Sequence, residues 1–310
     1  MLKNLKMAGM ALLLTVIAIP AMATGANPLV DTAWVKSNLG KSGVVFLDVT
    51  SNPGAYARGH IPGAVYTHYK NDKWRVDGKK NGSKVAGVLP PVANLEKLIG
   101  KLGIGNGDHV VIVANGSGAA DMGTATRLYW TFLVLGHERV SIMNGGMSAW
   151  NGDKANPLET AANKPAAKTF KARFNDALIA TSQEVTAALE DGATLIDSRP
   201  ADQNLGINKS GKVRAYGTIP GAISVPGAYM TVSGGGQIRD GGAIERLYKM
   251  SNAPTRGKSI TFCNTGHWAS LGWFAEYALM GNKESSMYDG SLAEWTIDDN
   301  APMERHVSLD

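Results

Sequence analysis

The sequence contains one cysteine, Cys263, and its surroundings are those of a reactive thiol. The apolar run 259–262 precedes it, and residues 264–268 lead into a stretch with helical spacing. Cys263 is therefore predicted to lie in a strand-to-helix loop, and open α/β sheets bind ligands beyond the carboxyl ends of their strands. A loop above a helix N-terminus directs backbone N–H groups and the positive end of the helix dipole inward, which favours a thiolate and holds an anion. A nucleophile and an anion site are thus expected at one place.

The sequence also repeats itself, and the repeat bears on this cysteine. The first copy contains the segments 44–48, 59–65, 110–113 and 143–150, and the second copy matches them in order with 194–197, 217–223, 259–262 and 288–295. Corresponding positions lie 145 to 158 residues apart, which is the length of a domain rather than of a solenoid unit. The run 110–113 leads to Ala114, so only the second copy has a thiol. A lone cysteine after a strand is more often a small core residue, and this difference between the copies is what favours a nucleophile.

The length and the pattern of hydrophobic residues predict the fold. At 310 residues the chain exceeds what one core usually covers, which favours two domains. Each copy alternates short runs rich in Val and Ile with longer stretches of helical spacing, which predicts an α/β fold in which each domain is a parallel sheet with helices on both faces. We place an N-terminal domain at 24–150, a linker at 151–177 and a C-terminal domain at 178–310.

The first residues have the pattern of an export signal. Lys3 and Lys6 precede an apolar stretch, and the small residues 21–23 follow it. The alternative is an uncleaved membrane anchor, but a span needs about 20 apolar residues and this stretch is shorter. We therefore expect a signal peptide at 1–23, and a mature protein that is periplasmic or secreted and not attached to a membrane.

Composition limits the classes of function. Hydrophobic residues make up 44% and charged residues 18%, which excludes a disordered chain, and 37 Gly without a period of three exclude a collagen-like one. The densest basic cluster is only Lys79, Lys80 and Lys84, in a chain of formal net charge +5. Because nucleic-acid binding requires a basic face, we expect no nucleic-acid partner.

Three elements together resemble tandem-domain sulfurtransferases of the rhodanese family. They are Leu47-Asp48 with its counterpart Ile196-Asp197-Ser198-Arg199, the motifs Gly-His-Ile-Pro-Gly-Ala and Gly-Thr-Ile-Pro-Gly-Ala, and Cys-x-x-Gly in a six-residue loop starting at Cys263. The resemblance covers essentially 29–302. It implies two rhodanese-like domains, of which the C-terminal one carries the catalytic cysteine and the N-terminal one is inactive.

The resemblance implies a persulfide mechanism without cofactor or metal. The Cys263 thiolate takes the sulfane sulfur of a donor such as thiosulfate and releases sulfite, and cyanide or a thiol then accepts the sulfur. Backbone N–H groups of the loop would stabilise the thiolate and the persulfide in the manner of an oxyanion hole. The residues that would bind the substrate through this loop are Asn264, Thr265, Gly266, His267 and Trp268.

Arg199, which matches the family's Asp-Ser-Arg segment, is the candidate for binding the anionic end of the donor. The alternative is a structural ion pair with Asp197 or Asp202. The histidines other than His267 show no metal-ligand spacing with one another, in agreement with the expectation of no metal site. The glycine run 234–236 marks a flexible loop that could border the pocket.

The loop departs from both donor classes of the family. Thiosulfate-using members tend to have basic residues directly after the cysteine, where this sequence has Asn264 and Thr265, and mercaptopyruvate-using members tend to have small residues followed by Gly-Val-Thr. Thiosulfate is the first choice of donor and 3-mercaptopyruvate the alternative. His267 either is partly cationic near neutral pH and supplies the missing charge, or packs at the helix start. Trp268 either walls the pocket or packs in the core.

Two other classes of function remain as rivals. Cysteine phosphatases of related fold need an Arg at the end of the loop, and the next Arg after Cys263 is Arg305, which disfavours them. A non-catalytic sulfur-carrier or binding module, in which Cys263 holds sulfur without turnover, stays an alternative. We expect the protein to act as a monomer.

Overall fold

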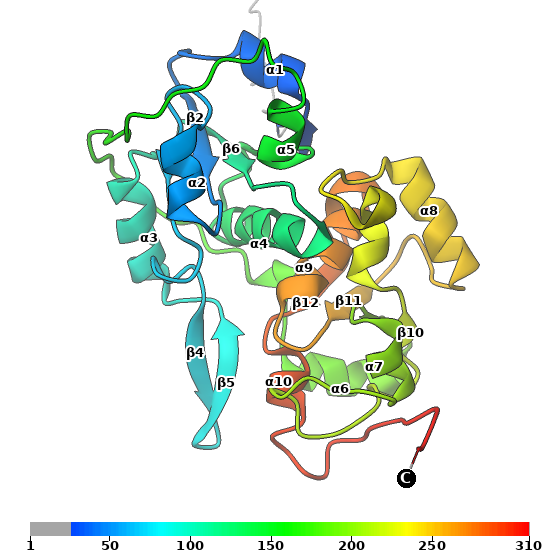
Figure 1. The fold of residues 1–310 in the computed structure, drawn as a ribbon. Coiled ribbons are helices and arrows are strands. Elements are labelled where there is room, and N and C mark those ends of the chain that lie inside the picture. Colours follow the sequence, from blue (N-terminus) through cyan, green and yellow to red (C-terminus); the bar gives the residue numbers. More distant parts are fainter. Residues whose placement is uncertain (1–25, 310) are drawn as a thin grey trace, which may run out of the picture.

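The runs rich in Val and Ile form two parallel sheets, one in each half of the chain (Figure 1). This is a computed structural model that describes residues 26–309, so the expected signal peptide lies outside the described residues. No helix in the described range is both long and apolar enough to cross a membrane. The prediction of two α/β domains with parallel sheets is confirmed.

The first sheet has the strand order β1-β7-β6-β2-β3, with every neighbouring pair parallel. The strands of this sheet are β1 (Leu29–Val30), β2 (Val44–Asp48), β3 (Val65–Tyr66), β6 (His109–Val113) and β7 (Val140–Met143). The helices of this half are α1 (Thr32–Ser37), α2 (Pro53–Arg58), α3 (Val92–Lys101), α4 (Ala119–Val134) and α5 (Gly146–Trp150). The central strand β6 is fully buried from Val110 onward, as expected for a parallel sheet covered by helices.

The second sheet has the order β10-β9-β11-β12-β8, again all parallel, and corresponds strand for strand to the first. Its strands are β8 (Ile179–Ala180), β9 (Thr194–Asp197), β10 (Ile223–Ser224), β11 (Ser259–Phe262) and β12 (Ser285–Tyr288). The α-helices are α6 (Ser182–Asp191), α7 (Ala201–Leu205), α8 (Gly241–Met250), α9 (His267–Phe274) and α10 (Ser291–Trp295). Short helical turns are η1 (Asp176–Leu178), η2 (Gly227–Met230), η3 (Val232–Gly234) and the π-helical η4 (Ala275–Leu279).

The Ile-Pro-Gly-Ala segments form the same turn in both domains. Gly63 and Gly221 adopt left-handed φ angles of 79° and 72°, which glycine permits without steric cost, and β3 and β10 follow directly. Glu159 accepts a hydrogen bond from the Gly63 amide at 2.7 Å, and Glu304 accepts one from the Gly221 amide at 3.0 Å. The internal repeat therefore extends past the last helix of each copy.

The segment expected as a linker, 151–177, packs along the N-terminal domain. Its Glu159 exchanges two backbone hydrogen bonds with His60, and the Lys168 amide donates to the Gly100 carbonyl at 2.9 Å. Phe170 from the same segment is buried in the core. The segment is therefore held against the first domain over much of its length.

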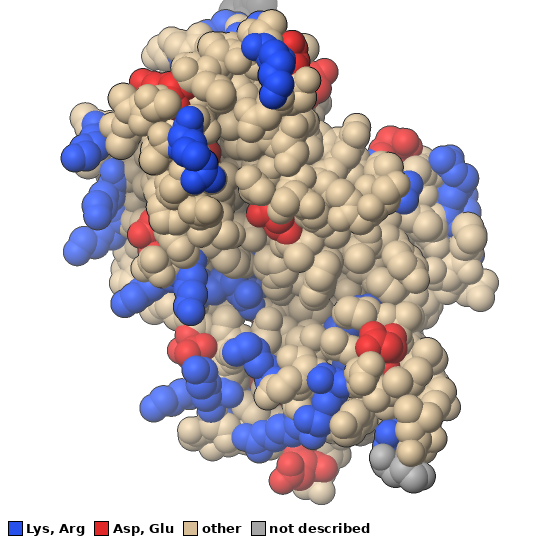
Figure 2. All heavy atoms as spheres, in the orientation of Figure 1, with Lys and Arg blue, Asp and Glu red and all other residues tan. Residues whose placement is uncertain are grey.

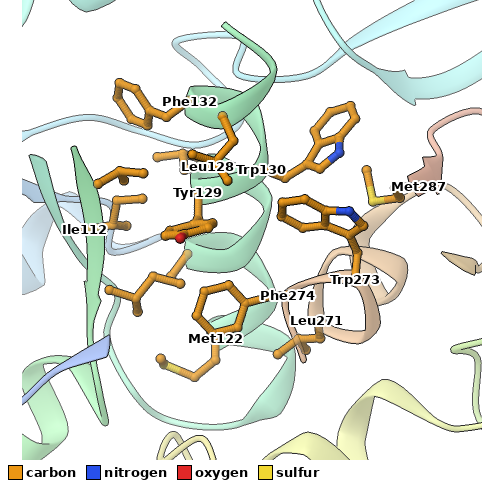
Figure 3. Packing of buried hydrophobic residues seen from close by; sticks show 14 of the residues in the cluster. Ile112, Met122, Leu128, Tyr129, Trp130, Phe132, Leu271, Trp273, Phe274 and Met287 are labelled. Atoms are coloured by element: carbon orange, nitrogen blue, oxygen red, sulfur yellow. The ribbon is translucent and has the colours of Figure 1, made fainter. Parts of the chain in front are cut away.

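The two domains share one hydrophobic core, because α4 of the first domain packs against α9 of the second. Figure 3 shows Tyr129 and Trp130 of α4 facing Trp273 and Phe274 of α9. The rings of Tyr129 and Phe274 meet edge to face with their centroids 4.9 Å apart. Burial of this many large side chains fixes one domain against the other.

An antiparallel hairpin of β4 (Val76–Lys80) and β5 (Ser83–Val88) extends from the first domain alongside the second (Figure 1). Lys80 in this hairpin lies 3.2 Å from the carboxylate of Glu294 and donates a hydrogen bond to Ser182 at 3.0 Å. The hairpin therefore joins the first domain to α10 and α6 of the second.

Candidate functional site

Cys263 lies where the sequence analysis expects it, directly after the central strand β11 and before α9, which begins at His267. Gly266 ends the loop with a φ of 76°, and a Cβ at this position would lie 2.6 Å from Arg127 and 2.8 Å from the Asp289 carbonyl. The cysteine side chain is only 1% exposed. The loop is thus tightly enclosed, and its shape requires glycine at the last position.

The first two carbonyl groups of the loop are held by the start of α10. The Leu292 amide donates to the Cys263 carbonyl at 3.1 Å, and the Ala293 amide donates to the Asn264 carbonyl at 2.9 Å. The first domain has the same arrangement, since the Met147 amide donates to the Ala114 carbonyl. Ala114 is therefore the structural counterpart of Cys263.

The next two carbonyl groups are held by arginines from the other domain. Arg75 donates to the Thr265 carbonyl, and Arg127, on α4, donates to the Gly266 carbonyl at 3.2 Å. The Arg127 guanidinium is fully buried and lies 2.6 Å from a carboxylate oxygen of Asp289. Two guanidinium groups from the N-terminal domain thus flank the cysteine loop, and the charge of one of them is offset by Asp289.

These contacts determine where the loop amides point. In a trans peptide the C=O and N–H groups point in opposite directions, so outward carbonyls turn the amides of Asn264, Thr265 and His267 inward. Within residues 26–309 these three amides donate no hydrogen bond. A ring of free amides at a helix N-terminus is a typical anion site, and it stabilises negative charge that develops on the enclosed atom.

The Ser291 side chain holds the two ends of the cysteine loop together. Its hydroxyl accepts hydrogen bonds from the amides of Cys263 and Gly266, both at 3.1 Å, and donates one to the Tyr288 carbonyl at 2.8 Å. Ser291 has a φ of 50°, a strained angle for a residue with a side chain, whereas its counterpart in the first domain is Gly146 with a φ of 55°. Sequence reasoning missed Ser291, although the substitution of a serine for a glycine between the two copies was a usable signal.

His267 is neutral near neutral pH, so the interpretation that it supplies the missing positive charge is wrong. Burial, together with the neighbouring charges of Arg75 and Arg127, lowers its pKa to about 4. The ring nitrogen Nε2 lies 2.7 Å from the Ala120 carbonyl, and Nδ1 lies 3.4 Å from the Tyr69 hydroxyl. Both partners belong to the first domain, so His267 fastens the start of α9 to that domain.

Arg199 forms the ion pair that was the alternative to donor binding. Its Nη2 lies 2.5 Å from the Asp197 carboxylate, Nε binds the same group, and Nη2 also donates to the Gly217 carbonyl. Both side chains are fully buried. The Nη1 atom is also buried and has no hydrogen-bond partner among the described residues.

The remaining candidate residues occupy different surroundings. Asn264 donates through Nδ2 to Gln203 at 2.8 Å, which ties the loop to α7. Trp268 is partly buried at the margin of the core and packs against Gly227. The described residues include no group of three or more His, Cys, Asp or Glu side chains placed to share a metal ion.

A cleft of about 620 Å³ opens beside the cysteine loop, between the hairpin and the C-terminal domain. We call it the interdomain cleft, and the residues of its wall that matter below are Tyr69, Lys70, Lys73, Arg75, Lys212 and Thr265. Figure 2 shows Lys and Arg side chains gathered around the hollow on this side of the molecule.

Sequence reasoning found neither Arg75 nor Arg127, because both lie in the other domain and carry no local motif. The glycine run 234–236 does not line this cleft; Gly236 packs instead against Gly116 of the first domain.

In the first domain, the loop that follows β6 is occupied by the side chain of Asp121. The amides of Gly116 and Ser117 donate to the Asp121 carboxylate at 2.5 and 3.2 Å. Burial raises the pKa of Asp121, while these two hydrogen bonds lower it. The first domain thus keeps the anion-binding loop but occupies it internally and has no thiol there.

Comparison with known proteins agrees with this architecture. Residues 31–153 and 181–298 each match the Rhodanese-like domain family. A protein of Saccharopolyspora erythraea named "Putative thiosulfate sulfurtransferase" is 30% identical over 274 residues, which cover 86% of this chain and 92% of that protein. A protein of Mycolicibacterium smegmatis with the same name is 29% identical, with 89% and 97% of the two chains covered.

Solved structures show the same fold. The crystal structure of SseA from Escherichia coli, whose title concerns 3-mercaptopyruvate sulfotransferases, is 23% identical with a TM-score of 0.72, and the match covers 86% of this chain and 98% of that one. An anaerobic ergothioneine biosynthesis enzyme from Chlorobium limicola is 22% identical with a TM-score of 0.74, covering 91% and 71%. With two matching domains and an enclosed loop at the carboxyl end of the second sheet, the chain belongs to the rhodanese family and is a sulfurtransferase.

Proposed function

We propose that the protein transfers the sulfane sulfur of thiosulfate to cyanide or to a thiol through a persulfide on Cys263. The observation that carries the proposal is the cysteine loop, in which every carbonyl from Cys263 to Gly266 is held outward and free amides face the enclosed space. Such a loop stabilises a thiolate before the reaction and a persulfide anion after it.

The proposed reaction has two steps. The Cys263 thiolate attacks the outer sulfur of thiosulfate, a bond forms between Sγ and that sulfur, and the sulfur–sulfur bond of the donor breaks, so sulfite leaves with the electron pair. Cyanide then attacks the terminal sulfur and leaves as thiocyanate, which returns the electron pair to Sγ. With a thiol as the acceptor, the product is the persulfide of that thiol. Neither step needs an external oxidant or reductant.

The charges around the loop support an anionic donor. The loop has no basic residue after the cysteine, but Arg75 and Arg127 reach its carbonyls from the N-terminal domain. The Arg75 guanidinium lowers the free energy of a negative charge in the loop, whereas the charge of Arg127 is offset by Asp289. His267 is kept neutral by burial first and by the charges of the two arginines second. Thiosulfate and 3-mercaptopyruvate are both anions, so the loop geometry is compatible with either donor.

The test is intact-mass spectrometry of the mature protein, first with thiosulfate and then with cyanide. We expect a gain of about 32 mass units, one sulfur atom, that disappears with cyanide and is absent in the Cys263→Ser control. Repeated turnover with both substrates distinguishes an enzyme from a sulfur carrier. The same measurement on protein expressed from the full sequence tests the proposal that the protein is exported. The expected result is a mass that lacks residues 1–23.

A protein that stays at its unmodified mass in thiosulfate but gains sulfur from 3-mercaptopyruvate would replace the donor and keep the mechanism. A protein that gains sulfur from neither, although its thiol is reduced, would overturn the proposal. A gain of one sulfur atom in the Cys263→Ser variant, which has no cysteine, would show that the added mass is not a persulfide on Cys263 and would overturn the assignment of the nucleophile.

A further inference from the structure

The wall of the interdomain cleft has four basic side chains and one acidic side chain, Asp77, so its net charge is positive. Lys70, Lys73 and Lys212 in its wall form no ion pair within residues 26–309, and Arg75 donates to the carbonyl oxygens of Gly87 and Thr265 rather than to a carboxylate. The acidic residue in the wall, Asp77, is already paired with Lys84 at 2.6 Å. Unpaired cations from both domains around one hollow create a positive potential that attracts an anion.

The size of the cleft leaves room for a ligand larger than the donor. A volume of about 620 Å³ is in the range of pockets that enclose ligands of drug size, and it is far larger than thiosulfate or cyanide. Thr265 forms part of the wall, whereas the thiol of Cys263 does not. A ligand that contacts the lysines and also delivers a reacting atom past Thr265 therefore needs negative charge and a nucleophile in the same molecule.

We propose that the interdomain cleft binds the sulfur acceptor, and that this acceptor is a thiol with two or more carboxylates. The proposal rests on the proposed function, because it assigns the second substrate of that reaction. The carboxylates pair with Lys70, Lys73 and Lys212, and the thiol points past Thr265 toward the persulfide. The acceptor thiolate attacks the terminal sulfur, forms a new sulfur–sulfur bond and leaves the electron pair of the broken bond on Sγ.

The first experiment separates the two half-reactions. Protein loaded with sulfur is freed of donor, and its discharge is followed with mercaptosuccinate, a dicarboxylate thiol, and with 2-mercaptoethanol, an uncharged one. The test variant is Lys70→Gln/Lys73→Gln/Lys212→Gln, and the matched control is Lys36→Gln/Lys97→Gln/Lys249→Gln, which removes three exposed lysines away from the cleft. Arg75 is left in place because its loss would disturb the loop carbonyl that it binds.

We expect the cleft variant to discharge with mercaptosuccinate about tenfold more slowly than the control variant, since three attractive charges are lost. Discharge with 2-mercaptoethanol should be equal in the two variants, and loading by thiosulfate, itself an anion, should slow much less than discharge with mercaptosuccinate. Equal slowing with both thiols, or loading by the donor that slows as much as discharge with mercaptosuccinate, would overturn the proposal because the lysines would then serve the loop or the donor. No effect in any step would overturn it as well.

A binding measurement makes the outcome independent of the donor. Isothermal titration calorimetry of mercaptosuccinate with the Cys263→Ser protein measures the affinity of the cleft for this thiol without any sulfur transfer. The three lysine substitutions should weaken this affinity about tenfold, against no change for the control set. Equal affinities would overturn the acceptor site even if the protein transfers sulfur, and a tenfold loss would support it even if thiosulfate proves to be the wrong donor.

Discussion

At the scale of single residues, the structure changes the meaning of Arg199. The sequence motif allowed either a donor-binding arginine or a structural ion pair, and Arg199 is buried with Asp197 at 2.5 Å. Asp197 also accepts hydrogen bonds from Thr218 and Asn204, so the carboxylate joins several segments at the end of β9. A buried pair of this kind is costly to break because the partner is left as an uncompensated charge.

Arg199→Met is therefore expected to lower the free energy of unfolding by about 3–5 kcal/mol, measured by urea denaturation at neutral pH. Adding Asp197→Asn removes the stranded charge and should recover part of the loss. The rate at which thiosulfate loads the folded double variant should stay close to that of the unmodified protein. A stable double variant that cannot be loaded would instead show that Arg199 binds the donor.

At the scale of elements, the two loops at the carboxyl ends of β6 and β11 differ in what fills them. The loop after β11 has Cys263 and free amides, whereas the amides of the loop after β6 are bound by Asp121. A second anion would have to displace this carboxylate, and the two negative charges would repel each other. The first domain therefore lacks free loop amides at Gly116 and Ser117 as well as the cysteine.

We predict that moving the thiol does not move the activity. The double variant Ala114→Cys/Cys263→Ser should gain no sulfur from thiosulfate in intact-mass spectra, because Asp121 occupies the amides that would stabilise the persulfide. Thiol titration of the denatured variant provides the control that the new cysteine is present and reduced. A gain of about 32 mass units that cyanide removes would contradict this explanation.

The elements were easier to predict from the sequence than the contacts between them. The strand-to-helix loop, the turns at Ile-Pro-Gly-Ala and the parallel sheets depend on local composition and on the repeat, which a sequence displays directly. Arg75 and Arg127 act on the loop through tertiary contacts from another domain, and nothing in their own neighbours marks them. Ser291 lies between these cases, since only the comparison with Gly146 makes it visible.

At the scale of the whole molecule, each domain covers the loop of the other. Arg75 and Arg127 of the first domain hold the cysteine loop, while Asn144 exchanges two hydrogen bonds with Ile238 of the second domain beside the loop that follows β6. The shared core between α4 and α9 supports both arrangements. Stability and the geometry of the site therefore depend on the same interface.

Acid should weaken this interface through His267. Burial lowers its pKa to about 4 from an unfolded value near 6.5, so the neutral form is favoured in the folded protein and its contribution is complete above pH 6.5. As the pH falls from 6.5 toward 4, the unfolded chain binds the proton first, and about 3 kcal/mol of stability is lost from this residue.

Urea denaturation at several pH values measures this effect as the difference between the unmodified protein and His267→Gln. The gap in free energy of unfolding should be constant above pH 7 and shrink by about 3 kcal/mol toward pH 4, because glutamine does not titrate. Taking the difference removes the contributions of the other titrating groups to the pH dependence. These groups include Asp48 and Glu276, whose pKa values burial raises. A gap that is independent of pH would show that His267 does not titrate as inferred.

The enclosure of Cys263, at 1% exposure, has a consequence for the chemical lifetime of the protein. Peroxides and alkylating agents attack thiolates that they can reach, so a covered sulfur is spared between turnovers. An inhibitor directed at this sulfur must then follow the route of the substrates, and small anionic electrophiles should outperform bulky neutral ones. The arginines that assemble the loop thus also act as a filter for the reagents that can damage it.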